Sequence, residues 1–452
     1  MAYLCCKYSN YILLGGIKMA RINKWNPEDD QYWQSEGKRH ARRNLWISVP
    51  SLMLAFIVWQ IWSIVAIRLN DIGFNFTDTQ LFTLAAMPGL VGATLRFVYT
   101  FGVGMFGGRN WTVLTTAVLA IPAMGIGFAV QNPETPYSVM LLLAALSGLG
   151  GGNFSSSSSN ISFFFPKKAR GTALGINGGL GNMGVSVVQF VTPLIITTGT
   201  FAFIAGNGQT LSNGQQVWLQ NAAFIWLIPI AIVTIAAWFG MDNLPGTKQS
   251  FSDQFVIVKR KHTWIMTWLY VATFGSFIGY SAAFPLLLKS QFPEYISLAF
   301  LGAFLAAASR PVGGWLADKI GGAKLTAIVL FVMMGGAGGV IFFLGNKQFG
   351  GFLASFLILF IAAGIGSGST FQMIPGIFVP KEAAPVLGFT AAFAAYGSFL
   401  IPKLFGWSVN ISGGYVPAFS IFIAFYVVSI VLNWYYYQRK TSGSALTQKK
   451  AA

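Results

Sequence analysis

The sequence is poor in charge and nearly free of cysteine and histidine. Charged residues make up 9% of its 452 residues, which include 12 Asp and Glu, two His and two Cys. Soluble domains carry about 25% charged residues, so this composition excludes an ordinary soluble protein. Cys5 and Cys6 are adjacent, so they offer neither a disulfide framework nor a metal-site spacing. We therefore expect no metal and no cofactor.

Long apolar runs dominate the sequence. Hydrophobic residues make up 54% of the chain, and apolar stretches of about 20 residues, long enough to cross a bilayer as a helix, recur along it. The pattern predicts an all-α membrane protein with 12 transmembrane helices. They lie at roughly 44–67, 79–104, 112–131, 136–165, 169–198, 221–241, 263–288, 296–317, 323–345, 350–379, 383–412 and 417–437.

The basic residues gather on one side of the predicted membrane. Of the 29 Lys and Arg, 23 fall in the tails and loops of one side, whereas the loops of the other side hold only Arg68, Lys289 and Lys347. Basic residues are enriched in cytoplasmic loops. We therefore expect both termini in the cytoplasm. We therefore interpret the net charge of +17 as a consequence of membrane orientation. It also attracts anionic lipid, and it does not indicate nucleic-acid binding.

The predicted spans fall into two groups of six. A cytoplasmic N-terminal segment (1–43) precedes one six-helix bundle (44–241), and a polar cytoplasmic linker (242–262) leads to the second bundle (263–437) and a basic cytoplasmic tail (438–452). Residues 1–18 read like a translated ribosome-binding sequence, which favours Met19 as the true start. A disordered tail is the other interpretation of this segment.

The two halves repeat each other at a separation of about 214 residues. Such a repeat indicates two pseudo-symmetric six-helix bundles, related by an axis along the membrane normal, with a substrate site between them at mid-depth. The matched positions are Arg96 with Arg310, Gly107-Gly108 with Gly321-Gly322, Pro166-Lys167 with Pro380-Lys381, Leu174-Gly175 with Leu387-Gly388, and Gly152-Asn153-Phe154 with Ser369-Thr370-Phe371.

The segment GGWLADKIGG (313–322) resembles a loop motif of the major facilitator superfamily. The resemblance implies that Gly313, Asp318, Lys319 and Gly322 take part in gating on the cytoplasmic side. The corresponding segment of the first half, 104–109, lacks the aspartate. The motif is therefore better developed in the second half.

Two arginines, Arg96 and Arg310, lie inside predicted spans at equivalent positions of the repeat. An arginine in the hydrocarbon core costs about 2.5–3.5 kcal/mol on insertion scales. All 12 carboxylates fall in loops, tails or span ends, so none is placed to neutralise them. Two unpaired cations facing one cavity favour an anionic substrate, and a guanidinium fork suits a planar oxyanion. The alternative is that carbonyls or hydroxyls cap each arginine as a structural element.

The same shortage of acids bears on energy coupling. Both histidines lie in predicted cytoplasmic segments, so no intramembrane Asp, Glu or His offers itself as a proton carrier. This favours obligatory anion exchange, with proton coupling through Tyr, Lys or water as the alternative. Lys403, in the outer part of span eleven, is interpreted as a membrane-interface or outer-gate residue.

Several stretches resemble the nitrate/nitrite porter family of the major facilitator superfamily. They are ARRNLWISV (41–49), GFNFT (73–77), NISFFFPK (160–167), ALGINGGLGNMGVSV (173–187), ATFGSFIGYSA (272–282) and GSGSTFQM (366–373). The resemblance implies that Arg96 and Arg310 hold the anion, that Asn182 and Tyr270 donate hydrogen bonds to it, and that Phe154 and Phe274 cover its flat faces. Asn177, Ser367 and Ser369 are further candidates, with helix–helix hydrogen bonding as the alternative.

Glycines are frequent in predicted spans five and eleven. Glycine lets neighbouring helices approach closely, so a gliding or bending gate is predicted in spans five and eleven. Its glycines are Gly175, Gly178, Gly179, Gly181, Gly184, Gly388 and Gly397. These glycines lie within spans and do not follow a strand, so they do not indicate a phosphate loop.

The function that fits best is nitrate/nitrite antiport by alternating access in a bacterial inner membrane, by a monomer. A proton-coupled nitrate symporter is the main alternative. An anion-binding membrane sensor is disfavoured because the predicted tails are too short for an output domain. An enzyme is excluded because no nucleophile–base set, metal cluster or nucleotide loop is visible. Nitrate, nitrite and the lipid bilayer are the expected partners, and nucleic acid is not.

Overall fold

The computed structural model describes residues 11–14, 17–20, 22, 24–199, 206–211, 214–245 and 256–439. Within these ranges, 12 helical segments are long and apolar enough to cross a membrane. The all-α membrane architecture predicted from the apolar runs is therefore confirmed. Much of segment 1–18, the middle of the predicted linker and the tail from residue 440 lie outside the described residues.

The N-terminal half supplies six spans, most of them built from two consecutive helices. Span one begins with α2 (Asp30–Tyr32) and a π turn η1 (Trp33–Gly37). The helices that follow are α3 (Lys38–Gln60), α4 (Trp62–Leu69), α5 (Asp78–Phe106), α6 (Gly108–Ala117), α7 (Ala120–Ala129), α8 (Tyr137–Ser147), α9 (Leu149–Phe164), α10 (Lys167–Asn182), α11 (Gly184–Ile195), α13 (Asn221–Phe224) and α14 (Leu227–Gly240).

The C-terminal half supplies the other six spans. They consist of α16 (Lys261–Tyr270), the π turn η4 (Val271–Gly275), α17 (Ser276–Gln291), α18 (Phe300–Ile320), α19 (Gly322–Gly345), α20 (Phe349–Ile377), α21 (Pro380–Ala395), α22 (Gly397–Ser412) and α23 (Val416–Asn433), followed by the π turn η6 (Trp434–Gln438). Short 3-10 turns lie at Asn70–Ile72 (η2), Val256–Lys259 (η3) and Pro293–Leu298 (η5).

The structure adds two features to the pattern expected from the sequence. The first helical segment begins at Asp30, well inside the segment 1–43 that was expected to precede the bundle. Two small antiparallel strand pairs also accompany the helices: β1 (Tyr11–Leu14) with β2 (Ile17–Ala20), and β3 (Gln209–Thr210) with β4 (Gln216–Val217). Val217 of β4 packs into the buried hydrophobic core.

The repeat of the sequence has a backbone cause at the glycine pairs. Gly107 ends α5 with φ of 84°, and Gly321 ends α18 with φ of 91°. Side chains with a Cβ rarely adopt a positive φ, so glycine is favoured at both turns. Each turn lies 11 residues after one of the two intramembrane arginines. The two halves thus place Arg96 and Arg310 at the same height above equivalent helix ends.

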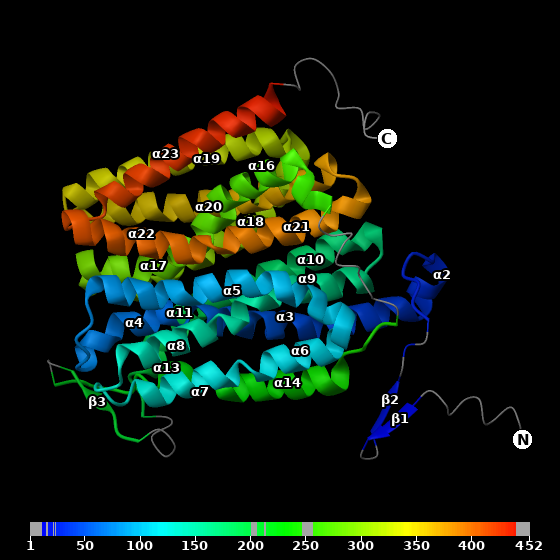
Figure 1. The fold of residues 1–452 in the computed structure, drawn as a ribbon, viewed down its shortest axis with the longest axis horizontal. Helices are drawn as coiled ribbons and strands as arrows, with labels where there is room; N and C mark the ends of the chain where they lie inside the picture. The colour runs from blue at the N-terminus through cyan, green and yellow to red at the C-terminus, as the bar shows by residue number, and fades with distance from the viewer. Residues whose placement is uncertain are drawn as a thin grey trace, which may run out of the picture.

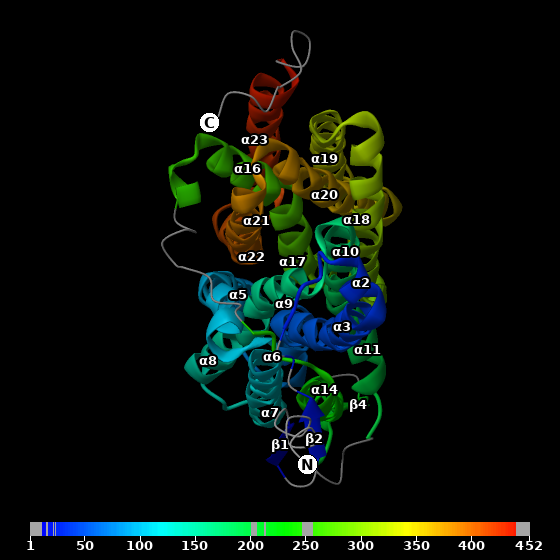
Figure 2. The same ribbon diagram turned by 90° about the vertical axis from the view of Figure 1, so that its right-hand side faces the viewer.

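The two halves lie side by side as separate layers of helices. In Figure 1 the N-terminal half (blue to green) forms the lower layer and the C-terminal half (green to red) the upper layer, with α5 next to α22 at the boundary. Figure 2, viewed along the helices, shows the same separation of the two halves. A path between the halves would therefore run parallel to the helix axes.

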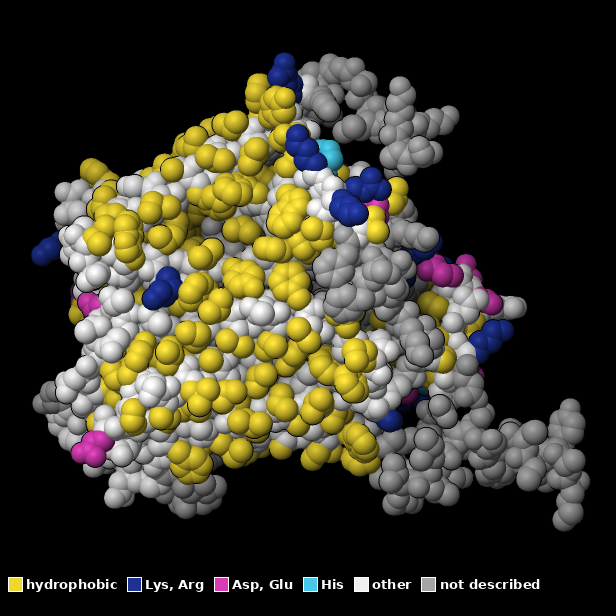
Figure 3. Space-filling view, viewed as in Figure 1, with side chains coloured by type: hydrophobic (Ala, Val, Ile, Leu, Met, Phe, Trp, Pro, Cys, Tyr) yellow, Lys and Arg dark blue, Asp and Glu magenta, His cyan; other side chains and the backbone are white. Residues whose placement is uncertain are grey.

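One end of the bundle carries most of the charge. Lys38, Lys167 and Lys261 start helices α3, α10 and α16 at this end, which we call the basic end. In Figure 3, charged side chains gather at this end, and hydrophobic side chains cover most of the face between the two ends. A broad apolar belt with charge at its margin is the surface expected of a bilayer-embedded protein.

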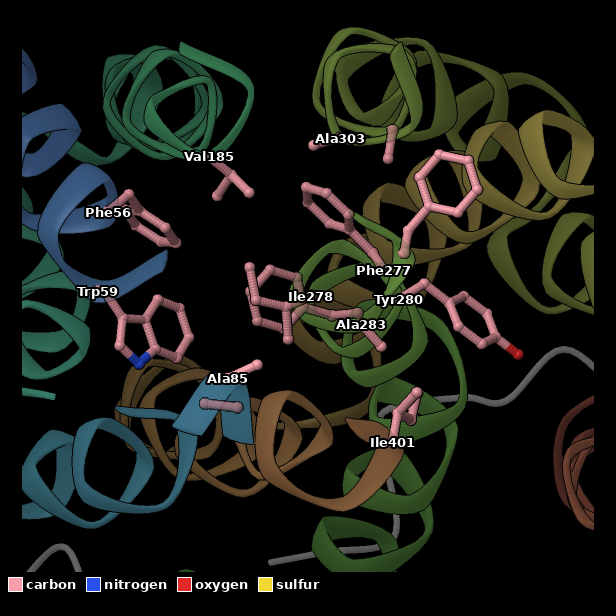
Figure 4. Packing of buried hydrophobic residues seen from close by; sticks show 14 of the residues in the cluster. Phe56, Trp59, Ala85, Val185, Phe277, Ile278, Tyr280, Ala283, Ala303 and Ile401 are labelled. Carbon is pink, nitrogen blue, oxygen red and sulfur yellow. The ribbon is translucent and has the colours of Figure 1, made fainter. Parts of the chain in front are cut away.

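The far end of the bundle, opposite the basic end, is closed by contacts between the halves. Asp71 and Lys289 form an ion pair there, and Gln60 Nε2 donates to Ser398 Oγ at 3.0 Å. Apolar side chains from both halves, among them Trp59 and Ile278, also pack together at the boundary (Figure 4). The boundary between the halves is therefore sealed from mid-depth to the far end.

A buried carboxylate ties the first helix to the end of the sixth span. Arg43 Nη2 donates to Asp242 at 2.7 Å, His40 Nδ1 lies 2.9 Å from the same oxygen, and Asn44 Nδ2 donates to it at 2.9 Å. Burial raises the pKa of Asp242, but the hydrogen bonds and charges of His40 and Arg43 lower it more, so its pKa lies below the ordinary value of 3.8. The cluster therefore stabilises the basic end of the N-terminal half.

Candidate functional site

A large cavity opens between the two halves at the basic end. Its volume is about 2110 Å³, and it is bordered by Lys167 and Arg170 near the start of α10 and by Phe154 and Arg310 at mid-depth. The cavity thus leads from the basic end to one of the two intramembrane arginines. Because the far end is sealed, the described conformation is open to one side only.

Arg96 lies behind this cavity, fully buried, and bridges the two halves. Its Nε donates to the carbonyl of Gly151 at 2.9 Å in the N-terminal half, and its Nη1 donates to the carbonyl of Ala391 at 2.7 Å in the C-terminal half. Its Nη2 is buried and has no hydrogen-bond partner in the described part of the chain. The carbonyl-capping alternative therefore accounts for two of its nitrogens and leaves the third free.

Arg310 lies opposite, on α18, with a similar division of its donors. Its Nη2 donates to the hydroxyl of Tyr270 at 2.8 Å. Its Nη1 is buried and, among the described residues, unpartnered. Each arginine thus anchors part of its guanidinium on protein and keeps one terminal nitrogen free, which is the condition for binding an exogenous acceptor.

Aromatic rings surround both guanidinium groups. The Cζ of Arg96 lies 4.9 Å from the ring centroid of Phe154, and the Cζ of Arg310 lies 5.5 Å from that of Phe371. Both guanidiniums also lie over the ring of Phe274, at 5.7 and 5.2 Å. Cation–π attraction steadies each cation without neutralising it. One ring, Phe274, therefore marks the centre of the site.

The expected aromatic sandwich has nearly the spacing that a flat ion needs. The rings of Phe154 and Phe274 lie 6.4 Å apart at 28° to each other. An ion stacked between two faces needs about 7 Å, from two van der Waals contacts of about 3.5 Å each. A small separation of the rings would admit a planar anion and exclude water from its faces.

Carboxylates stay away from the two arginines. In the described ranges neither arginine forms an ion pair. Asp318 and Glu382 do border the cavity, but Gln372 donates to Asp318 at 2.6 Å and Arg260 donates to Glu382 at 2.8 Å. A fully buried Arg96 and a half-buried Arg310, neither with a carboxylate partner, favour binding of an anion between them.

The other polar candidates bond either to a neighbouring helix or within their own helix. Asn182 Nδ2 donates to its own helix at Gly178, and Asn177 Nδ2 donates to Ser157 at 2.9 Å. Among the described residues, no hydrogen bond joins Asn182 to either arginine. Ser369 bonds with Thr326 on α19, and Ser367 donates to the carbonyl of Gly364. For Asn177 and Ser369 these contacts match the helix–helix alternative, whereas the contact of Ser367 lies within its own helix α20.

The gate glycines divide into two groups. A Cβ added at Gly181, Gly184 or Gly397 would lie within 2.7 Å of an atom of another helix, so these positions need glycine for packing. A Cβ at Gly175, Gly179 or Gly388 would meet no atom within 4 Å, and one at Gly178 would touch the ring of Phe154 at 3.4 Å. The second group borders the cavity, where open space is available in this conformation.

The loop-motif residues lie at the basic end of α18 and the start of α19. A Cβ at Gly313 would collide with the carbonyl of Ile365, and one at Gly322 would meet the side chain of Met373. Lys319 Nζ lies 3.9 Å from the ring centroid of Trp315. The glycines therefore permit close packing of α18 and α19 against α20.

Lys403 joins the two halves near the far end. Its Nζ donates to Thr83 Oγ1 at 3.0 Å, from α22 to α5. The contact is consistent with the expected outer-gate position, because it lies on the closed side of the site.

Sequence reasoning missed four groups at the site. They are the ring of Trp59, 5.2 Å from the Cζ of Arg96, the ring of Phe371, and the carbonyls of Gly151 and Ala391. Phe371 was available from the repeat, since it matches Phe154 in the other half. The carbonyls were not, because every residue has one.

Comparison with known proteins adds three findings. The model of the Major Facilitator Superfamily matches residues 47–402. The nitrate/nitrite transporter NarU of Escherichia coli K12 is 47% identical over 93% of this chain and 96% of its own, and the probable nitrate/nitrite antiporter NarK2 of Thermus thermophilus is 42% identical over 95% and 99%. The crystal structure of a D-xylose–proton symporter is 16% identical and superposes with a TM-score of 0.67, covering 87% of this chain and 97% of its own. The last likeness concerns the fold.

Proposed function

The chain belongs to the nitrate/nitrite porter family of the major facilitator superfamily, and from this premise we propose that it exchanges nitrate and nitrite across a bacterial inner membrane. It is a multi-pass membrane transporter, not an enzyme. Both relatives named above are bacterial and carry nitrate and nitrite in their names. One chain holds both arginines and both halves, so we propose that a monomer is sufficient.

One observation carries the substrate assignment. Arg96 and Arg310 each keep one buried terminal nitrogen unpartnered within the described residues, over the same aromatic ring. Nitrate and nitrite are planar anions whose oxygens lie around a rim and whose faces are flat. Donors at the rim and rings on the faces suit such ions, and charge-assisted hydrogen bonds strengthen where water is excluded.

Exchange follows from the same charges. An empty site holds two like charges, and Arg96 also spans the halves through the Ala391 carbonyl. Closing the cavity around two uncompensated cations is costly, whereas an anion offsets part of that cost. The loaded carrier therefore converts between its two open states more readily than the empty one, which couples entry of one anion to exit of another.

The orientation follows from the basic residues. We place the basic end, and with it the termini, in the cytoplasm because basic loops are retained there. The described conformation is then inward-open. Alternating access would close this cavity by rocking the two halves about the arginines, with the open glycines of α10 and α21 as the surfaces that approach.

Counterflow in proteoliposomes tests the proposal. We expect labelled nitrate to enter liposomes loaded with nitrate or nitrite, and not liposomes loaded with chloride, with no change of internal pH. An Arg310→Lys variant should lose this exchange, whereas an Arg42→Lys variant, changed at an exposed residue of α3, should keep it.

Two outcomes would contradict the proposal. Nitrate uptake into chloride-loaded liposomes together with stoichiometric internal acidification would establish proton symport instead. Absence of nitrate and nitrite movement in any loading would remove the substrate assignment.

A further inference from the structure

The hydroxyl of Ser155 is an unused donor at the wall of the cavity. Ser155 follows Phe154 on α9, borders the cavity and is 5% exposed. Its Oγ has no hydrogen-bond partner in the part of the chain that the structure describes. A buried hydroxyl without a partner carries a desolvation cost, so its presence beside an anion site needs an explanation.

The helix explains why this hydroxyl is free. Serine in a helix usually donates to the carbonyl three or four residues earlier. Ser156 and Ser162, on the same helix, do so, to Asn153 at 3.2 Å and to Ser158 at 2.8 Å. For Ser155 the carbonyl four residues earlier belongs to Gly151.

Arg96 already occupies that carbonyl. A carbonyl oxygen has two lone pairs. In α9 one lone pair of Gly151 accepts the helical amide of Ser155, and Arg96 Nε donates to the same oxygen at 2.9 Å. Arg96 therefore competes for one of the two carbonyls, of Gly151 and Gly152, that the Ser155 hydroxyl could use within the helix, and in this structure the hydroxyl bonds to neither.

We propose that Ser155 is a third donor to the bound anion and that it distinguishes nitrate from nitrite. The inference rests on the proposed function and concerns the substrate preference of the same site. The free nitrogens of Arg96 and Arg310 serve two oxygens, which is all that nitrite has. Nitrate has a third oxygen, and a donor from α9 completes its rim.

Equilibrium binding to the purified, detergent-solubilised full chain tests this assignment. We expect Ser155→Ala to raise the Kd for nitrate about tenfold, the loss of one hydrogen bond to a charged group, and the Kd for nitrite by less than about threefold. Ser155→Thr keeps the hydroxyl and should restore nitrate binding. Ser156→Ala, which removes a hydroxyl bonded within the helix, is the matched control and should bind both ions normally.

Thermal stability separates binding from packing. Removing an unpartnered buried hydroxyl should leave the Tm of the ion-free protein unchanged or higher, so Ser155→Ala should be at least as stable as the parent. A nitrate Kd within twofold of the parent would overturn the assignment. Equal losses for both ions would overturn the claim that Ser155 senses the third oxygen. If the parent chain itself binds neither ion, the proposed function falls, and this inference falls with it.

Discussion

Replacing Arg310 with lysine tests most directly whether Arg96 and Arg310 hold the anion together. The positive charge stays, but the planar fork is lost. In the structure, Arg310 uses Nη2 to hold Tyr270 at 2.8 Å and leaves Nη1 free. A lysine has one nitrogen on a flexible stem, and it cannot occupy both positions at once. Either the tyrosine or the anion therefore loses its donor.

The expected loss of nitrate affinity corresponds to one hydrogen bond from a charged group. A hydrogen bond to a charged group contributes about 1.5–3 kcal/mol, and each 1.4 kcal/mol changes Kd about tenfold. We expect Arg310→Lys to weaken nitrate binding by roughly 10- to 100-fold. Isothermal binding measurements on purified protein give the Kd, and counterflow gives the matching loss of exchange. Arg42→Lys controls for the substitution itself.

A double-mutant cycle sharpens the result. Tyr270→Phe keeps the ring that stacks 5.2 Å from Phe274 but removes the hydroxyl that orients Arg310. If lysine no longer reaches this hydroxyl, Tyr270→Phe should add little to Arg310→Lys. Nitrate affinity near that of the parent in Arg310→Lys would refute the fork argument.

Three other predictions concern the gate, the basic end and the far end. Gly179→Leu should bind nitrate normally but exchange at least about tenfold more slowly, because its side chain fits the open cavity and obstructs closure; full-rate counterflow would refute this. The folded-state pKa of Asp242 lies below 3.8, so the stabilisation from its ionised carboxylate is present at higher pH and is lost as the pH falls through that folded pKa. The fall in Tm below about pH 4 should therefore be smaller in Asp242→Asn than in the parent. An equal fall of Tm in both proteins would refute this. Lys289→Met should open the far end by breaking the pair with Asp71, raising the thiol labelling of a single cysteine introduced at the far end; Lys347→Met is the control, and unchanged labelling would refute the role of this ion pair in closing the far end.

The residues predicted from the repeat were those with a strong chemical signal. Arginine inside an apolar span is costly enough to stand out, and Arg96 and Arg310 do face one aromatic ring. The glycine pairs at Gly107 and Gly321 also stand out, and both backbones adopt the positive φ that glycine permits. Each of these signals is local, so a single sequence can display it.

The position of Asn182 depends on more than a local signal. The resemblance implies that this amide hydrogen-bonds the anion, which stays a prediction, and in the structure its Nδ2 donates to Gly178 on the same helix. The direction of a side chain depends on the rotation of its helix against its neighbours. That rotation is set by packing with residues far away in the chain, which a local pattern does not contain.

Hydropathy and repetition along the sequence alone determined the membrane class, the two halves and the presence of two unneutralised arginines. These properties depend on the composition of contiguous segments and on the cost of burying charge in lipid. Only the tertiary structure decided which guanidinium nitrogens remain free. Backbone carbonyls at Gly151 and Ala391, from different halves, take two donors of Arg96. Carbonyls are the same at every residue, so only the packing of distant helices selects the two that bind.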